Sequence, residues 1–207
     1  MFHKIRILSI FLLLVYLMTT GVYSQTSTDN TEPAARKNEK YSGGMLVLQG
    51  GLISYHNTHQ QLQKFSYGFG GILRLYVHPY ICVGIYGGTQ KMNYSTQDAK
   101  SSYLQIGYGG PLIGMSTKKN KFRYSCLVSM GGGSIKNLHI NKQSDNTLID
   151  ASLYKIPVFT LSPLLSIDYA ISPKIAFTLQ ATCLFGFNKQ QNTLYNPCLQ
   201  MGILFSH

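Results

Sequence analysis

Hydrophobic and polar residues alternate with a period of two along most of the chain after Gly43. In the clearest stretch, residues 174–187, every second side chain is apolar: Ile175, Phe177, Leu179, Ala181, Cys183, Phe185 and Phe187. The residues between them are mostly small or polar, such as Thr178, Gln180 and Thr182. Successive side chains of a β-strand point to opposite faces of its sheet, so this pattern predicts a long strand with one apolar face.

The same alternation predicts seven more strands, eight in all, after Gly43. It is clear at 65–77, 122–131 and 198–205, and weaker at 44–55, 80–94, 103–115 and 154–169. Two of the weaker segments contain prolines, which cannot donate a hydrogen bond to a β-ladder. Pro157 and Pro163 interrupt the sixth segment, and Gly109-Gly110-Pro111 breaks the parity of the fourth. We therefore expect β-bulges in these two strands.

Short and long connections alternate between the segments. Short turns are expected at 78–79, 117–121 and 170–173, and longer polar loops at 57–63, 95–102, 136–153 and 188–196. Membrane-spanning barrels have this rhythm, with short turns on the periplasmic side and longer loops outside. Loops on a rigid scaffold often carry recognition, so the longest loop, 136–153, is the expected contact surface.

Alternation by itself leaves open whether the apolar face points to lipid or into a core. A soluble, periplasmic ligand-binding barrel of the lipocalin type would bury that face, and this alternative stays open. Two features favour lipid. The opposite faces carry Gly, Ser, Thr and Gln, which suit the narrow interior of an eight-stranded barrel. Aromatic residues also mark both ends of the apolar faces, as at two membrane interfaces: Phe65, Tyr67, Phe185 and Phe187 at the loop end, and Phe122, Tyr124, Tyr169 and Phe205 at the turn end.

We therefore predict an all-β protein, an eight-stranded antiparallel up-and-down transmembrane β-barrel. Eight strands leave no aqueous channel of porin width, so we expect a packed lumen without an open pore. A structural or surface-interaction role follows from this prediction.

The amino terminus has the features of a secretory signal peptide over residues 1–24. Lys4 and Arg6 precede an apolar run at 7–18, and small residues then offer a cleavage site before Gln25. The apolar run is shorter than the roughly 20 residues of a membrane-spanning helix. Residues 25–42 are polar and balanced in charge, which predicts a flexible periplasmic leader. The barrel domain then covers residues 43–207.

Composition agrees with this division. Of the 207 residues, 44% are hydrophobic and only 12% are charged, about half of the roughly 25% charged residues of ordinary soluble domains. The 18 Lys and Arg against 7 Asp and Glu give a formal charge of +11. The basic residues are scattered through turns and loops without a stripe or a motif, so we expect no nucleic-acid partner. Contact with anionic lipid is the expected role of the basic charge.

The last segment carries a further pattern, Leu199-Gln200-Met201-Gly202-Ile203-Leu204-Phe205, which alternates and ends in an aromatic residue. With this segment, the strand number and the loop rhythm, residues 43–207 resemble the small eight-stranded outer-membrane β-barrels of Gram-negative bacteria, the porin-like or opacity-type β-barrel domain. The resemblance implies a location in the cell outer membrane. It also implies that Leu199, Met201, Ile203 and Phe205 form the signal read by the barrel-assembly machinery. The chain departs from the usual form because Ser206 and His207 follow the aromatic residue.

Four charged residues fall on the inward parity near the turn end: Arg74, Arg123, Asp168 and Lys174. Arg123, Asp168 and Lys174 come from consecutive segments, with the acid in the middle. A buried charge needs a partner, so we expect Asp168 to bridge Arg123 and Lys174 and to close the periplasmic mouth. Solvated rim residues beside turns are the alternative, and both interpretations are structural.

Other residue types give weaker hypotheses. Cys82, Cys126, Cys183 and Cys198 have parities that do not favour disulfides, and we expect them to act as small apolar side chains. No Cys or His spacing suggests a metal site, and no motif suggests a cofactor. A lipid acyltransferase using His56 or His59 with loop acids (Asp98, Asp145 or Asp150) is the enzyme alternative, but no spacing ties these residues together, so we expect no catalysis.

Lysines on the loop side outnumber the loop acids, and they could bind phosphates of the outer-membrane lipid, including lipopolysaccharide: Lys64, Lys91, Lys100, Lys136, Lys142, Lys155 and Lys189. Solubility alone would also explain any single lysine. We further expect a monomer, with a possible extracellular partner bound through the loops.

Overall fold

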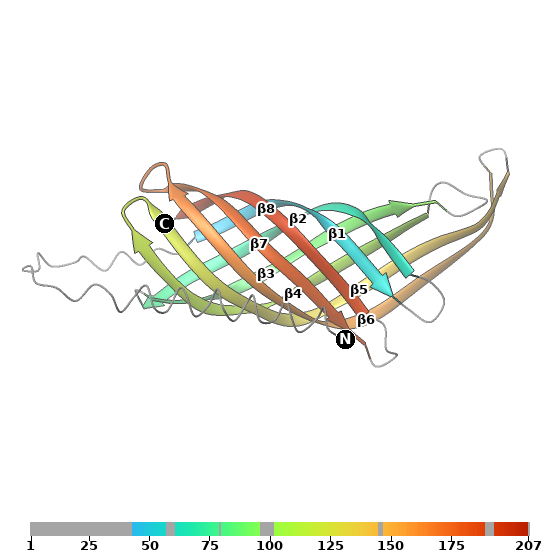
Figure 1. The fold of residues 1–207 in the computed structure, drawn as a ribbon, viewed down its shortest axis with the longest axis horizontal. Coiled ribbons are helices and arrows are strands. Elements are labelled where there is room, and N and C mark those ends of the chain that lie inside the picture. Colours follow the sequence, from blue (N-terminus) through green and yellow to red (C-terminus); the bar gives the residue numbers. More distant parts are fainter. Residues whose placement is uncertain are drawn as a thin grey trace, which may run out of the picture. The chain divides into compact units, whose positions relative to one another are not determined.

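The computed structural model describes residues 43–56, 61–78, 80–95, 102–144, 147–188 and 193–206, with the side chains of 141–148 and 206 left undescribed. The predicted signal peptide and leader lie outside the described residues. The described residues form eight strands (Figure 1): β1 (Gly43–His56), β2 (Gln61–His78), β3 (Ile81–Tyr94), β4 (Ser102–Lys119), β5 (Phe122–Ser144), β6 (Thr147–Ala170), β7 (Ile175–Phe187) and β8 (Thr193–Ser206).

Each strand pairs antiparallel with the next, and β8 pairs with β1, so the sheet is a closed barrel. The predicted fold, an eight-stranded up-and-down barrel, is confirmed. Among the described residues, none lies in a helix long and apolar enough to cross a membrane.

The strands are staggered around the barrel. Starting at Ser116 on β4, the paired residues are Ser125, Ser166, Gln180, Gln200, Gln49, Gly68 and Gln90, and the row returns to β4 at Ile106, ten residues nearer the loop end. Such a shear accompanies strands that tilt by roughly 35–45° and an interior just wide enough for side chains. A single row of paired residues therefore climbs the inner wall as it circles the barrel.

The alternation in the sequence becomes an inside and an outside. On β7, Ala176, Thr178, Gln180, Thr182 and Leu184 are buried in the interior. On the other strands, too, the apolar residues that alternate with the inward positions face outward and are exposed. Examples are Leu46 at 77%, Leu48 at 67% and Phe69 at 66%. The apolar faces predicted for β2, β7 and β8 all point outward.

Aromatic residues on the outer face gather near both ends of the strands. At the turn end, the ring of Phe122 packs against those of Tyr124 and Tyr169. At the loop end, the ring of Phe185 packs against Tyr195. Aliphatic side chains lie between the two groups, including Leu48, Leu179 and Met201. The outer surface is therefore an apolar band between two aromatic girdles, as the sequence predicted.

The bulges predicted at prolines are absent from the described strands. The register is unchanged on both sides of Pro111, Pro157 and Pro163, and the parity of β4 is kept through Gly109-Gly110-Pro111. Instead, two consecutive pairings are missing at Pro111 in the β4–β5 ladder and two at Pro163 in the β6–β7 ladder, while Pro157 lies where β6 has passed the end of β7. The continuous ladders on either side hold the register. The missing N–H of a proline therefore interrupts the pairing locally, and no extra residue is inserted to form a bulge. Register shifts occur elsewhere, at Tyr76/His78 and between Ile140 and Gln143.

The longest predicted loop, 136–153, is mostly strand. β5 and β6 have 23 and 24 residues, against 13 to 18 in the other strands, and they stay paired from Phe122↔Tyr169 to Ser144↔Thr147. Figure 1 shows this hairpin extending past the ends of the neighbouring strands. The sequence did not reveal it because polar residues occupy both faces of the hairpin where it leaves the barrel, so the period of two is lost.

Closure of the barrel predicts a sharp difference between two glycines at the β1–β8 seam. A Cβ added to Gly202 would lie 2.2 Å from the carbonyl oxygen of Leu46, whereas one added to the outward Gly44 would meet nothing within 4 Å. Gly202→Ala should lower the free energy of unfolding by about 1–3 kcal/mol, because the crowded seam must shift. Gly44→Ala is the matched control and should change it little. Urea titration in detergent, read by heat-modifiable gel migration, would measure both; equal stabilities would contradict the described seam.

Candidate functional site

A buried ion pair crosses the interior near the turn end. Arg74 of β2 and Asp168 of β6 are 0% and 3% exposed, and Nη1 of Arg74 lies 2.9 Å from Oδ2 and 3.2 Å from Oδ1 of Asp168. The hydroxyl of Thr178 on β7 donates a third hydrogen bond to Oδ1, at 2.9 Å. Both carboxylate oxygens are thus satisfied by strands from opposite walls of the barrel.

The partner of Asp168 differs from the one expected from the sequence. Arg123 and Asp168 are paired in the β5–β6 register, yet the guanidinium of Arg123 lies over the ring of Tyr76, 4.1 Å from its centroid. Lys174 is exposed in the turn before β7, where the hydroxyl of Ser172 accepts a hydrogen bond from its backbone N–H. The parity argument failed for Lys174 because β7 begins one residue later, at Ile175. Of the four predicted residues, the structure therefore joins Arg74 and Asp168 as an ion pair.

A network of amide and phenol groups fills the middle of the lumen. We call it the lumen network: Gln49, Ser66, Tyr86, Gln90, Tyr108, Asn196 and Gln200. The Oε1 atom of Gln49 accepts hydrogen bonds from Gln90, Tyr108 and Gln200, at 3.1, 2.7 and 2.8 Å. Its Nε2 donates to the backbone carbonyls of Phe69 and Thr89. One side chain of β1 is thereby tied to four other strands.

The hydrogen-bond directions in the lumen network are fixed by its members. The Tyr108 hydroxyl donates to Gln49, so its oxygen is available to accept from Tyr86, 3.0 Å away. The Tyr86 hydroxyl in turn accepts from Nε2 of Gln200 at 2.7 Å. Asn196 and Ser66 both donate to Oε1 of Gln90, at 2.6 and 2.9 Å. Chains of this kind strengthen one another where water is excluded, and they hold a single arrangement.

Glycine makes room for this network. Gly88 of β3 faces the lumen, and a Cβ there would lie 2.7 Å from the amide nitrogen of Gln49. Sequence reasoning missed the lumen network as a unit, although Gln49, Gln90 and Gln200 all lie on alternating positions. The signal was present in their residue type, but the stagger that places these residues in one row is a property of the closed barrel.

Directly above the lumen network, toward the loop end, lies a layer of apolar inward side chains. Six of them are no more than 3% exposed: Ile53, Met92, Leu104, Ile106, Ile135 and Leu194. They come from β1, β3, β4, β5 and β8, so they surround the axis of the barrel. From the turn end to the loop end, the interior therefore passes from an ion pair to an amide network and then to an apolar layer.

The remaining candidate residues that the structure describes do not form a recognised chemical site. All four cysteines are free, with Cys82 and Cys198 inside and Cys126 and Cys183 on the outer parity. His56 is exposed at the loop end of β1, and His59, Asp98 and Asp145 lie outside the described residues. Within the described part of the chain, no three His, Cys, Asp or Glu side chains gather as metal ligands would. Leu199, Met201, Ile203 and Phe205 all face outward on β8 and are 47–62% exposed.

The ion pair gives a direct prediction. Asp168→Asn should lower the free energy of unfolding by about 3–5 kcal/mol, because it leaves the Arg74 guanidinium buried without a counter-charge. The double variant Arg74→Met/Asp168→Leu should recover most of this loss, since it removes both charges. Lys174→Gln, in the exposed turn, should stay within about 0.5 kcal/mol of the parent. Urea titration of the refolded barrel gives the three free energies of unfolding. An Asp168→Asn variant as stable as the parent would show that the ion pair does not stabilise the barrel.

Known proteins share the fold but little sequence. No family model matches the chain, and no curated protein sequence matches it significantly. Neisserial surface protein A (NspA) is 10% identical, with a TM-score of 0.56 over 82% of this chain and 100% of NspA. The attachment invasion locus protein Ail of Yersinia pestis, solved with the heparin analogue sucrose octasulfate, is 12% identical, with a TM-score of 0.50 over 80% of this chain and 99% of Ail. The chain therefore has the fold of the small eight-stranded outer-membrane β-barrel proteins.

Proposed function

We propose that this protein is an integral outer-membrane barrel of a Gram-negative bacterium, with a closed lumen, no catalytic activity, and a structural or surface-interaction role. The observation that carries the proposal is the set of exposed apolar side chains on the outer faces of all eight strands, with aromatic residues near both ends. Monomeric soluble proteins rarely expose apolar patches beyond a few hundred Å². A lipid environment accounts for this band, whereas a soluble ligand-binding barrel would place it in water.

The interior supports a closed lumen. The Arg74–Asp168 pair, the lumen network and the apolar layer with Leu104 and Ile106 occupy successive levels of the barrel. An eight-stranded barrel has room for side chains in its interior and little else. The role of the protein therefore rests on its surface, and a single protomer closes its own sheet, which agrees with a monomer.

The β5–β6 hairpin is the proposed recognition element. It extends beyond the other strands, and its two strands stay paired up to Ser144↔Thr147, so a partner would meet a regular β-hairpin. β1 begins and β8 ends at the turn end, which is the periplasmic side in outer-membrane barrels. The hairpin then projects from the opposite, extracellular side. Insertion itself would depend on the barrel-assembly machinery reading β8, whose outward residues are Leu199, Met201, Ile203 and Phe205.

Location and orientation can be tested together. The full chain, expressed in a Gram-negative host with an epitope tag inserted between β5 and β6, should fractionate with the outer membrane and migrate differently on gels when unheated. Intact cells should bind antibody to the tag, because the hairpin is extracellular. A tag placed in the turn between β4 and β5 is the control and should be detected only after the outer membrane is permeabilised. Recovery in the soluble periplasmic fraction would refute the proposal.

The closed lumen makes a separate prediction. The refolded barrel in planar bilayers should show no stable conductance steps of porin size, because an eight-stranded barrel has an interior only wide enough for side chains, and buried side chains line this one. A general porin measured in the same salt serves as the positive control. Regular steps of porin size from the pure barrel would contradict a closed lumen and leave the membrane location unaffected.

A further inference from the structure

Three lysines lie in one row on the outer surface. Lys91 of β3 pairs with Gln105 of β4, Gln105 pairs with Lys136 of β5, and Lys136 pairs with Lys155 of β6. Residues on both sides of Lys91, Gln105 and Lys136 are buried in the lumen, so this row faces outward: Gln90, Met92, Leu104, Ile106, Ile135 and Asn137. We call Lys91, Lys136 and Lys155 the lysine row.

The lysine row is positively charged without internal compensation. Lys136 and Lys155 are directly opposite on neighbouring antiparallel strands, an arrangement in which like charges repel. Among the described residues, no carboxylate lies within ion-pair distance of the three ammonium groups. The ammonium of Lys91 lies over the ring of Tyr103, 4.4 Å from its centroid, at the level of the loop-end aromatic residues. An anion at this level would relieve the repulsion.

Below the lysine row, one row of the outer face of β2, β3, β4 and β5 consists of glycines. Gly71, Gly87, Gly109 and Gly132 are paired successively across β2, β3, β4 and β5. Between this glycine row and the lysines lie three small residues, Thr89, Gly107 and Ser134. The glycine row ends at large exposed side chains, Leu46 on β1 and Phe159 on β6. The outer face therefore has a shallow floor with an apolar wall on each side.

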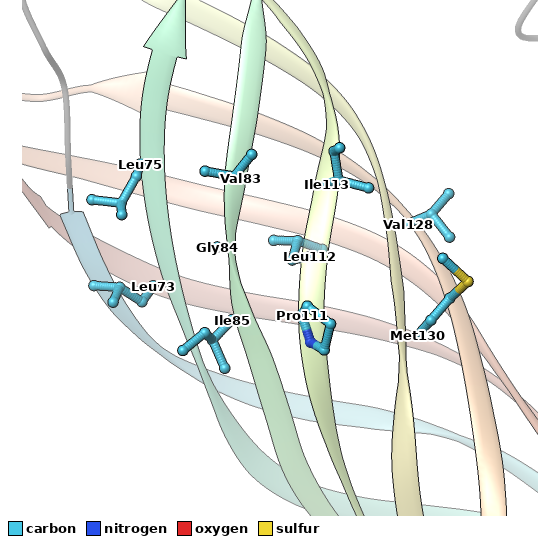
Figure 2. Close-up of a pocket in the computed structure, with 10 residues that line it drawn as sticks. All are labelled: Leu73, Leu75, Val83, Gly84, Ile85, Pro111, Leu112, Ile113, Val128 and Met130. Carbon is cyan, nitrogen blue, oxygen red and sulfur yellow. The ribbon is translucent and has the colours of Figure 1, made fainter.

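This floor leads into an apolar depression further down the same strands. The depression has a volume of about 470 Å³ and is lined by Leu73, Leu75, Val83, Gly84, Ile85, Pro111, Leu112, Ile113, Val128 and Met130. Its side chains come from β2, β3, β4 and β5, and Figure 2 shows Leu73 and Leu75 on one side and Val128 and Met130 on the other. Gln105 and Pro111 are six residues apart on β4, which corresponds to about 20 Å along a strand.

We propose that these features together bind one phosphorylated lipid of the outer leaflet, lipopolysaccharide, through its lipid A part. Its phosphates lie on the lysine row, and its acyl chains cover the glycine floor and enter the apolar depression. The inference rests on the proposed membrane function, because that orientation places the loop end in the outer leaflet. It adds a defined site to the general affinity of basic residues for anionic lipid.

The chemistry of the site selects this partner. Ammonium groups bind phosphate as point charges, and three of them along one row suit a headgroup with more than one phosphate. A free phosphate or a soluble anion would use the lysines only and would gain nothing from the glycine floor. An apolar partner would use the depression only. A ligand that needs both ends of the site carries phosphate and acyl chains in one molecule.

The test uses refolded full chain in detergent, titrated with bisphosphorylated lipid A and followed by native mass spectrometry. Lys91→Gln/Lys136→Gln/Lys155→Gln should raise the dissociation constant at least tenfold. The matched control, Lys119→Gln/Lys121→Gln/Lys174→Gln, removes the same charge from exposed positions at the turn end and should change it less than twofold. Dephosphorylated lipid A should bind the parent as weakly as lipid A binds the lysine-row variant.

A second pair of variants tests the floor. A Cβ added to Gly107 or Gly132 would meet nothing within 4 Å, and no described glycine has a positive φ, so larger residues fit the fold there. Gly107→Leu/Gly132→Leu should weaken lipid A binding at least threefold, while Gly44→Leu on β1 should not. Heat-modifiable migration confirms folding, and Gly107→Ala/Gly132→Ala replaces the leucine variant if it does not fold.

Two results would overturn the site. One is equal binding of lipid A by the parent and the lysine-row variant; the other is an equal loss in the turn-end control. Because binding is measured on refolded protein, neither result depends on where the protein is located in cells. A soluble periplasmic location would refute the proposed function and not the binding chemistry.

Discussion

A sheet that lies in hydrocarbon cannot leave a row of backbone N–H and C=O groups unpaired, because no water replaces the lost hydrogen bonds. In this barrel, the pairing of β1 with β8 removes the last open edge. Closure then forces a stagger of ten residues around the eight strands, and that stagger decides which inward side chains share a level. The ion pair, the lumen network and the outer lysine row are all consequences of one closed register.

The interior of the barrel contains many polar side chains, whereas its exterior is mostly apolar. Inside, the ion pair and the lumen network join polar side chains of different strands, and Oε1 of Gln49 accepts three hydrogen bonds. Outside, the exposed side chains are mostly apolar. The lysine row is an exception to this apolar surface. Lys136 and Lys155 carry like charges and lie directly opposite each other on the outer face, so they repel. This local cost is the observation on which the proposed lipid site rests.

Local sequence rules predicted the strands well and their ends poorly. The alternation on β2, β7 and β8 placed the apolar faces correctly, because a period of two survives whatever the strand pairs with. The rules failed where neighbours decide the outcome. Pro163 causes no bulge because intact ladders around it keep the register, and Lys174 leaves the lumen because the turn takes it before β7 begins. The β5–β6 hairpin extends past the barrel because its two strands stay paired, although the sequence there does not alternate between apolar and polar residues.

The sequence by itself determined the number of strands, the face that each strand turns outward, and the residue types available inside. These follow from side-chain direction along a strand, which is a local property. Only the tertiary structure decided that Asp168 pairs with Arg74 from β2, that Gln49, Gln90 and Gln200 meet, and that four glycines align beside three lysines. Those meetings depend on shear, which is fixed when the first strand meets the last, and no single segment carries that information.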